Sequence, residues 1–249
     1  MLAIIGGSGL TRLSTLAVAR REVIRTPYGE PSSALVFGQI AGRDVVFLAR
    51  HGHGHTIPPH RVNYRANLWA LQHRGVDATL AVASVGCIST LHSPGDLVLP
   101  HQLVDYTYGR EHTFFDGGDR KVVHVDFTQP YSREMRERCL GAAQTADIAL
   151  HDGGVYAAVS GPRLETAAEI DRLARDGATL VGMTGMPEAA LARELGIAYA
   201  TIAVVVNHAA GRGESSQQVS MEKIVAVLES AMDKVRTLID HVAHYGTSA

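Results

Sequence analysis

Residues Val181 to Asn207 read VGMTGMPEAALARELGIAYATIAVVVN, and this stretch predicts a strand, a short helix and a second strand. Pro187 suits the first position of the helix, and Gly196 suits the residue that follows its end. The run from Ala198 to Val206 is nearly all apolar and rich in β-branched residues, as expected of a strand buried on both faces of a parallel sheet. The stretch therefore indicates an α/β fold.

The ends of these two strands are the first candidate site. Ligands of α/β sheets bind beyond the carboxyl ends of strands, so we expect Met183-Thr184 and Asn207-His208 to lie near each other. The alternative is that Asn207 only begins a turn, which is the commoner role of a single asparagine after a strand. The pattern alone leaves both interpretations open.

The rest of the chain repeats the same alternation of buried strands and helices. No Pro/Ser-rich linker divides the 249 residues, so we expect one domain over residues 1–249. Strands are predicted at Leu2–Ile5, Ala34–Phe37, Asp44–Ala49, Ala78–Val85, Leu97–Leu99 and Gly153–Ser160. Helices are predicted at Asn63–Arg74 and Arg133–Ala146, after Thr166, and from Ser220 onward.

Composition excludes several classes of protein. The net charge is −2 and basic residues are scattered, so nucleic acid is not an expected partner. The longest apolar run has nine residues and MLAIIGG is too short for a signal peptide, so we expect a cytoplasmic protein with no membrane partner. Cys87 and Cys139 have neither metal-binding nor disulfide spacing.

A glycine-rich loop follows the first predicted strand. The backbone N–H groups of Gly6-Gly7-Ser8-Gly9 can form a nest for an anion, and phosphate is the natural ligand. Gly7 and Gly9 begin the dinucleotide pattern G-x-G-x-x-G, but its third glycine would fall at Arg12. The loop therefore favours phosphate over a dinucleotide.

Arg50 and three alternating histidines follow another predicted strand. The Arg50 guanidinium can hold phosphate in a bidentate fork. His51, His53 and His55 raise the question of a metal ion, but the intervening glycines favour a loop and no acidic residue nearby completes a ligand set. A solvated basic turn stays the alternative for His53 and His55.

Two further segments leave alternatives open. Residues 106–127 lack periodicity and predict a long loop, in which Phe114, Phe115 and His124 face either a partner subunit or the surface of their own chain. Glu165 either favours the start of the following helix or accepts a nitrogen-bound proton from a base.

Seven motifs spread over nearly the whole chain resemble those of the trimeric purine nucleoside phosphorylases, specifically their methylthioadenosine phosphorylase branch. Each motif is a modest signal alone, but their common order is specific. They are IIGGSGL at 4–10, TPYGEPS at 26–32, ARHG at 49–52, VNYRANLWAL at 62–71, PGD at 94–96, SGPR at 160–163 and GMTGMPE at 182–188.

The resemblance implies a three-layer α/β fold with a central mixed sheet flanked by helices. It also implies a homotrimer that cleaves a purine nucleoside with phosphate as co-substrate and needs no metal or other cofactor. By motif position, the phosphate-binding residues would be Ser8, Arg50, His51, Ala83 and Thr184. The nucleoside would contact Ser84, Leu164, Glu165, Val181, Gly182, Met183, Asn207, His208 and Ala209, with Met221, Ile224 and the His124 of an adjacent subunit at the 5′ end of the sugar.

Departures from the branch bear on the substrate. Methylthioadenosine phosphorylases typically have aspartates where this chain has Asn207 and Ala209, and an aromatic residue where it has Leu164. A carboxylate only accepts hydrogen bonds and suits a 6-amino group, whereas an amide can also donate to O6 and N7 of a 6-oxopurine. We assign catalytic roles to Asn207 and His51.

The 5′ end of the sugar favours an apolar substituent. Met221 and Ile224 predict an apolar wall that suits a methylthio group better than a hydroxyl. Base and sugar preferences together predict 5′-methylthioinosine as the substrate, with methylthioadenosine or a general 6-oxopurine nucleoside as the alternatives.

Overall fold

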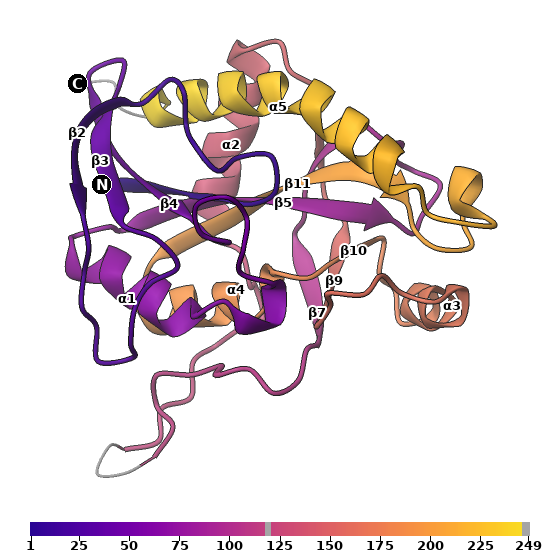
Figure 1. Cartoon of the computed structure of the whole chain (residues 1–249), viewed down its shortest axis with the longest axis horizontal. Coiled ribbons are helices and arrows are strands. Elements are labelled where there is room, and N and C mark those ends of the chain that lie inside the picture. The colour runs from indigo at the N-terminus through magenta and orange to yellow at the C-terminus, as the bar shows by residue number, and fades with distance from the viewer. Residues whose placement is uncertain (118–120, 246–249) are drawn as a thin grey trace.

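The computed structural model of the chain describes residues 1–117 and 121–245, and its core is one large mixed sheet between two layers of helices (Figure 1). The α/β class and the central mixed sheet are confirmed. In chain order the elements are β1 (Leu2–Gly6), β2 (Ala17–Glu22), β3 (Leu35–Ile40), β4 (Arg43–Ala49), η1 (Pro59–Arg61), α1 (Tyr64–His73), β5 (Ala78–Cys87), β6 (Leu97–Leu99), β7 (Gln102–Tyr106), α2 (Arg133–Thr145), β8 (Leu150–Asp152), β9 (Val155–Val159), α3 (Ala167–Arg175), β10 (Leu180–Gly182), α4 (Gly185–Glu194), β11 (Ala198–His208), η2 (Gly213–Ser215) and α5 (Met221–His244).

Strand β5 is the centre of the sheet, because three strands pair with it. Strand β11 lies parallel along one edge of β5 for its full length. On the other edge, β1 is parallel to the first half of β5, and β10 is antiparallel to the second half. Val181 and Asn207 are both register partners of Gly86, one from each side.

The direction of β10 corrects the expectation of two parallel strands around helix α4. Strand β10 is three residues long, is antiparallel to β5, and therefore does not run parallel to β11. It begins beside Cys87, at the end of β5, and returns along that strand. Its carboxyl end therefore leads away from the carboxyl end of β11. The two segments still lie close together, because Val181 and Asn207 flank the same residue of β5, Gly86.

Two helical layers cover the two faces of the sheet (Figure 1). Helices α1 and α4 pack on one face through buried side chains such as Leu68 and Leu191. Helices α2 and α5 pack on the other face through side chains such as Cys139 and Val235. The nearly unbroken apolar sequences of β5 and β11 follow from this arrangement, because both faces are buried.

The helix ends agree with the predicted signals. In α4, Met186 has non-helical angles (φ −121°, ψ 141°), so the regular helix begins at Pro187, and Gly196 follows its end with φ +69°. In α5, the Ser220 side chain caps the helix by accepting a hydrogen bond from the backbone N–H of Lys223. No helix in the described ranges combines the length and apolar character needed to cross a membrane.

Some features differ from the prediction. Strands β2, β7 and β8 were not predicted, because none of them contains a fully buried residue and their sequences lack a buried-strand pattern. Phe114 does not face a partner: it is 3% exposed and packs edge-on against Tyr28, with ring centroids 5.1 Å apart. His124 is exposed, so a contact with a partner subunit stays a prediction.

Candidate active site

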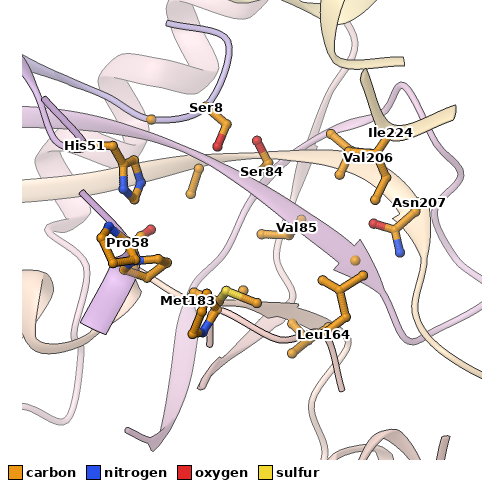
Figure 2. A pocket seen from close by; sticks show the side chains of 18 of the residues that line it. Ser8, His51, Pro58, Ser84, Val85, Leu164, Met183, Val206, Asn207 and Ile224 are labelled. Atoms are coloured by element: carbon orange, nitrogen blue, oxygen red, sulfur yellow. The ribbon is translucent and has the colours of Figure 1, made fainter. Parts of the chain in front are cut away.

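A cavity of about 570 Å³ lies beside the carboxyl end of β5 and collects most of the predicted site residues (Figure 2). Ser8 and His51 lie at one end of the cavity, and Asn207, Leu164 and Ile224 lie at the other. The predicted residues in its lining are Ser8, Arg50, His51, Ala83, Ser84, Leu164, Glu165, Val181, Gly182, Met183, Thr184, Asn207, Met221 and Ile224.

The glycine loop after β1 forms part of the Ser8 end. A Cβ on Gly7 would lie 2.9 Å from Nη1 of Arg50 and even closer to the Val82 carbonyl oxygen, so only glycine fits between the loop and β5. Thr184 is 6% exposed and lies just before α4, but its side chain makes no capping hydrogen bond. Backbone N–H groups, a hydroxyl and the positive end of a helix together suit an anion.

Arg50 is held rigidly by a second buried charge. Its Nε and Nη2 each donate to a carboxylate oxygen of Glu188 at 2.7 Å, and its Nη1 donates to the Val82 carbonyl at 2.9 Å. The bidentate fork predicted for phosphate is therefore occupied by Glu188. Arg50 still lines the cavity, and an anion there would meet the remaining N–H hydrogens and the positive charge.

Glu188 belongs to a buried polar network that sequence reasoning missed. The Tyr199 hydroxyl donates to Oε1 of Glu188 at 2.7 Å, and the Thr201 hydroxyl donates to the oxygen of Tyr199 at 3.0 Å. Burial lowers the pKa of Arg50, but the charge and hydrogen bonds of Glu188 outweigh burial, so the pKa of Arg50 is raised. Arg50 is therefore a permanent cation beside the cavity.

His51 is buried and neutral at physiological pH. Its Nδ1–H donates to the Ile57 carbonyl at 2.8 Å, which leaves Nε2 as a hydrogen-bond acceptor in the neutral ring. Burial, and then the positive charge of Arg50, lower the pKa of His51 to about 4. Because His51 lines the cavity, it offers a base rather than a second cation there.

The opposite end of the cavity carries an amide and a carboxyl group. Asn207 donates from Nδ2 to the His208 carbonyl at 2.6 Å, which orients the amide and leaves its second N–H and its Oδ1 for other partners. Burial raises the pKa of Glu165. The helix-start role considered for Glu165 belongs instead to Thr166 and Glu169, which form a reciprocal capping box at α3.

Several predicted residues lie outside the lining. His208 packs against Gly213, and the buried Ala209 packs in a small core cluster with Val181. His124 is exposed and lies outside the cavity lining of its own chain. His53 lines a different surface pocket, while His51 and His55 lie ring against ring with centroids 4.4 Å apart, so the three alternating histidines do not converge on one point.

The lining also contains residues that were not predicted. The run Ile57-Pro58-Pro59, which is visible in the sequence just after the histidines, forms a wall near His51, and the Ile57 backbone N–H donates to the His51 carbonyl at 3.0 Å. The other additions to the prediction are His55, Thr56, Val85, Gly86, Pro162, Val206, Ala210 and Val219, whereas Gly7 belongs to the predicted phosphate loop.

One cavity lies beside the central strand of this mixed sheet, with an anion-binding end and an amide-bearing end. This combination defines the class of the protein, which is a nucleoside phosphorylase. The model of the family described as the phosphorylase superfamily matches residues 1–244, and the chain belongs to that superfamily.

Relatives and solved structures agree with this membership. The chain is 52% identical, over 96% of its length and 97% of the relative, to a probable S-methyl-5'-thioinosine phosphorylase of Pseudomonas syringae pv. tomato. It is 43% identical, over 96% of its length and 90% of the relative, to a 6-oxopurine nucleoside phosphorylase of Pyrococcus furiosus. The methylthioadenosine phosphorylase of Schistosoma mansoni in complex with adenine is 32% identical and has a TM-score of 0.93, with 98% and 90% of the two chains covered.

Proposed function

We propose that the protein cleaves S-methyl-5′-thioinosine with inorganic phosphate, releasing hypoxanthine and 5-methylthioribose 1-phosphate. The observation that carries this proposal is Asn207: an amide, and not an acid, lies at the base end of the cavity, within the same lining as Glu165. The names of relatives at about 50% identity point to the same substrate.

The reaction develops positive charge on the sugar and negative charge on the departing base, and the site must stabilise both. Breaking a glycosidic bond develops positive, oxocarbenium-like charge on the sugar, and the departing base gains electrons. Phosphate at the Ser8 end would attack C1′ while Arg50 and the Thr184 segment hold it. Neutral His51 would accept a hydrogen bond from a phosphate hydroxyl through Nε2. This hydrogen bond would increase the negative charge on the phosphate and make it a better nucleophile.

The base end distinguishes 6-oxopurines from 6-aminopurines. The second N–H of Asn207 would donate to N7 or O6 of hypoxanthine, which both accept hydrogen bonds. A carboxylate oxygen of Glu165 would accept the N1–H that hypoxanthine has and adenine lacks. A buried polar mismatch costs roughly 1–3 kcal/mol, which corresponds to about tenfold or more in selectivity for each contact.

The wall near α5 favours a 5′-methylthio group. Met221, Ile224, Val206 and Val219 contribute apolar surface to the cavity. Met221 is 61% exposed in the single chain, so a neighbouring subunit would complete this wall. An apolar pocket rejects an added hydroxyl only modestly, so inosine would be a slower substrate.

The proposed assembly is a homotrimer in which His124 completes the 5′ site of an adjacent subunit. Val122 and Val123, beside His124, are 71% and 43% exposed in the single chain, and burial against a neighbour would remove this apolar surface from water. Sedimentation equilibrium tests the assembly: a monomer at micromolar concentration would contradict it. We further propose a cytoplasmic enzyme whose reaction uses phosphate as co-substrate and needs no cofactor.

A side-by-side phosphorolysis assay tests the function. Methylthioinosine, methylthioadenosine and inosine are supplied at equal concentration, with and without phosphate, and the free base is quantified. We expect phosphate-dependent release of hypoxanthine, fastest from methylthioinosine. Equal or faster cleavage of methylthioadenosine would make the protein a methylthioadenosine phosphorylase, and faster cleavage of inosine would make it a general 6-oxopurine nucleoside phosphorylase.

A further inference from the structure

A second group of potential ligands lies outside the cavity, at the β6 and β8 edge of the sheet. One donor atom from each of His92, Asp96 and His151 lies within 4.8 Å of the other two. Nε2 of His151 is 3.7 Å from Oδ2 of Asp96, and the rings of His92 and His151 have centroids 5.0 Å apart. His92 and Asp96 belong to one loop before β6, and the fold brings His151 of β8 next to them.

The backbone around these residues is fixed, which makes the cluster a consequence of the fold. Leu97 and Leu150 are register partners in the parallel strands β6 and β8, so Asp96, which directly precedes β6, lies near His151 of β8. The Ser93 backbone N–H donates to Oδ2 of Asp96 at 2.8 Å and orients the carboxylate. Such a supporting hydrogen bond is what a metal-binding carboxylate requires.

His92 supplies an independent indication of a missing ligand. Its Nδ1 is buried and has no hydrogen-bond partner among the residues that the structure describes. A buried polar atom without a partner costs roughly 1–3 kcal/mol, so native proteins usually supply one.

We propose that His92, Asp96 and His151 form a binding site for one divalent transition-metal ion, with Zn²⁺ as the first candidate. Two imidazole nitrogens and one carboxylate oxygen suit Zn²⁺ and related ions, and poorly suit Mg²⁺ or Ca²⁺, which prefer oxygen ligands. Tetrahedral ligands about 2.0–2.1 Å from zinc lie roughly 3.4 Å apart. Small side-chain rotations would therefore bring this set to coordinating distance.

A metal ion at this site would stabilise the position of β11, the strand that carries Asn207. The Gly95 backbone N–H donates to the Val205 carbonyl at 2.8 Å, and the Val205 N–H donates to the Asp96 carbonyl at 2.9 Å. A bound ion would link the loop of residues 92–96 to β8. The same loop is hydrogen-bonded to Val205 of β11, two residues before Asn207. The role is structural, and the proposal does not depend on the identity of the substrate.

Metal titration tests the proposal. Bound metal is first removed from the untagged protein with a chelator, and the chelator is then removed by dialysis. Zn²⁺ binding is measured by calorimetry, and Co²⁺ is used as a spectroscopic probe of coordination by nitrogen and oxygen ligands. We expect one ion per chain and a higher thermal unfolding midpoint with Zn²⁺. The stripped protein failing to bind either ion would overturn the proposal.

Matched variants identify the ligands. His92→Gln, Asp96→Asn and His151→Gln each remove one ligand, and Asp96→Asn retains an oxygen that can accept from Ser93. We expect each to weaken binding by at least about tenfold, because losing a group that merely orients a ligand already costs about 10–100-fold. His53→Gln, at an exposed histidine outside the cluster, is the control and should bind as the wild type does. Unchanged binding by the double variant of His92 and His151, or loss of binding in the control, would refute the assignment.

Discussion

The buried pair of Arg50 and Glu188 makes a sharp prediction about stability. Substitution Glu188→Gln preserves the shape of the side chain but removes its charge. The side chains of Arg50 and Glu188 are 1% and 0% exposed, so water cannot take the place of the lost carboxylate. The glutamine amide can offer one oxygen but not two, and Nε, Nη2 and the Tyr199 hydroxyl would compete for it.

The expected loss of stability is large. Removing one partner of a buried ion pair costs about 3–5 kcal/mol, because the other charge stays buried without compensation. For a chain of this size, each kcal/mol lowers the unfolding midpoint by about 2–4 °C, so Glu188→Gln should lower it by roughly 6–20 °C. The variant should also raise the KM for phosphate, since Glu188 positions Arg50 in the cavity lining.

The control is the same substitution in an exposed ion pair. Glu137 pairs with Arg133 at 2.7 Å, but the two side chains are 61% and 90% exposed. Glu137→Gln should therefore leave the unfolding midpoint close to that of the wild type. Urea or thermal unfolding at equal protein concentration compares the two variants. If Glu188→Gln were as stable as Glu137→Gln, the buried pair would not have the structural role argued from its geometry.

Three further outcomes follow from the cavity. Asn207→Asp should raise the kcat/KM ratio of methylthioadenosine to methylthioinosine by about tenfold or more, and an unchanged ratio would remove Asn207 as the discriminating residue. Ile224→Thr should raise activity toward inosine relative to methylthioinosine by roughly 2–10-fold, measured in paired assays. Because the folded pKa of His51 is lowered to about 4, the folded state binds fewer protons than the unfolded state between pH 6.5 and 4, and stability should fall as pH falls through this range. The His51 contribution is about 3 kcal/mol, and urea unfolding of His51→Gln, compared with wild type, should lack that part of the pH dependence.

The sequence was most informative where local patterns determine structure. The apolar runs that became β5 and β11, and the end signals Pro187, Gly196 and Ser220, needed no knowledge of distant contacts. The antiparallel direction of β10 could not be read in this way, because three residues carry no signal of strand direction. Glu188 and Arg50 are 138 positions apart, and a glutamate after Pro187 equally suits the exposed first turn of a helix. Pairing of this kind depends on the complete fold.

An irregularity in β11 explains how neighbouring residues serve one cavity. Successive side chains of a regular strand point to opposite faces, yet both Val206 and Asn207 line the cavity. The register with β5 shifts at this point: Val205 pairs with Val85, Asn207 pairs with Gly86, and Val206 is the extra residue of a β-bulge. A bulge turns a side chain away from its regular direction. Val206, the residue that interrupts the ladder, therefore lets β11 supply an apolar wall and the amide of Asn207 side by side.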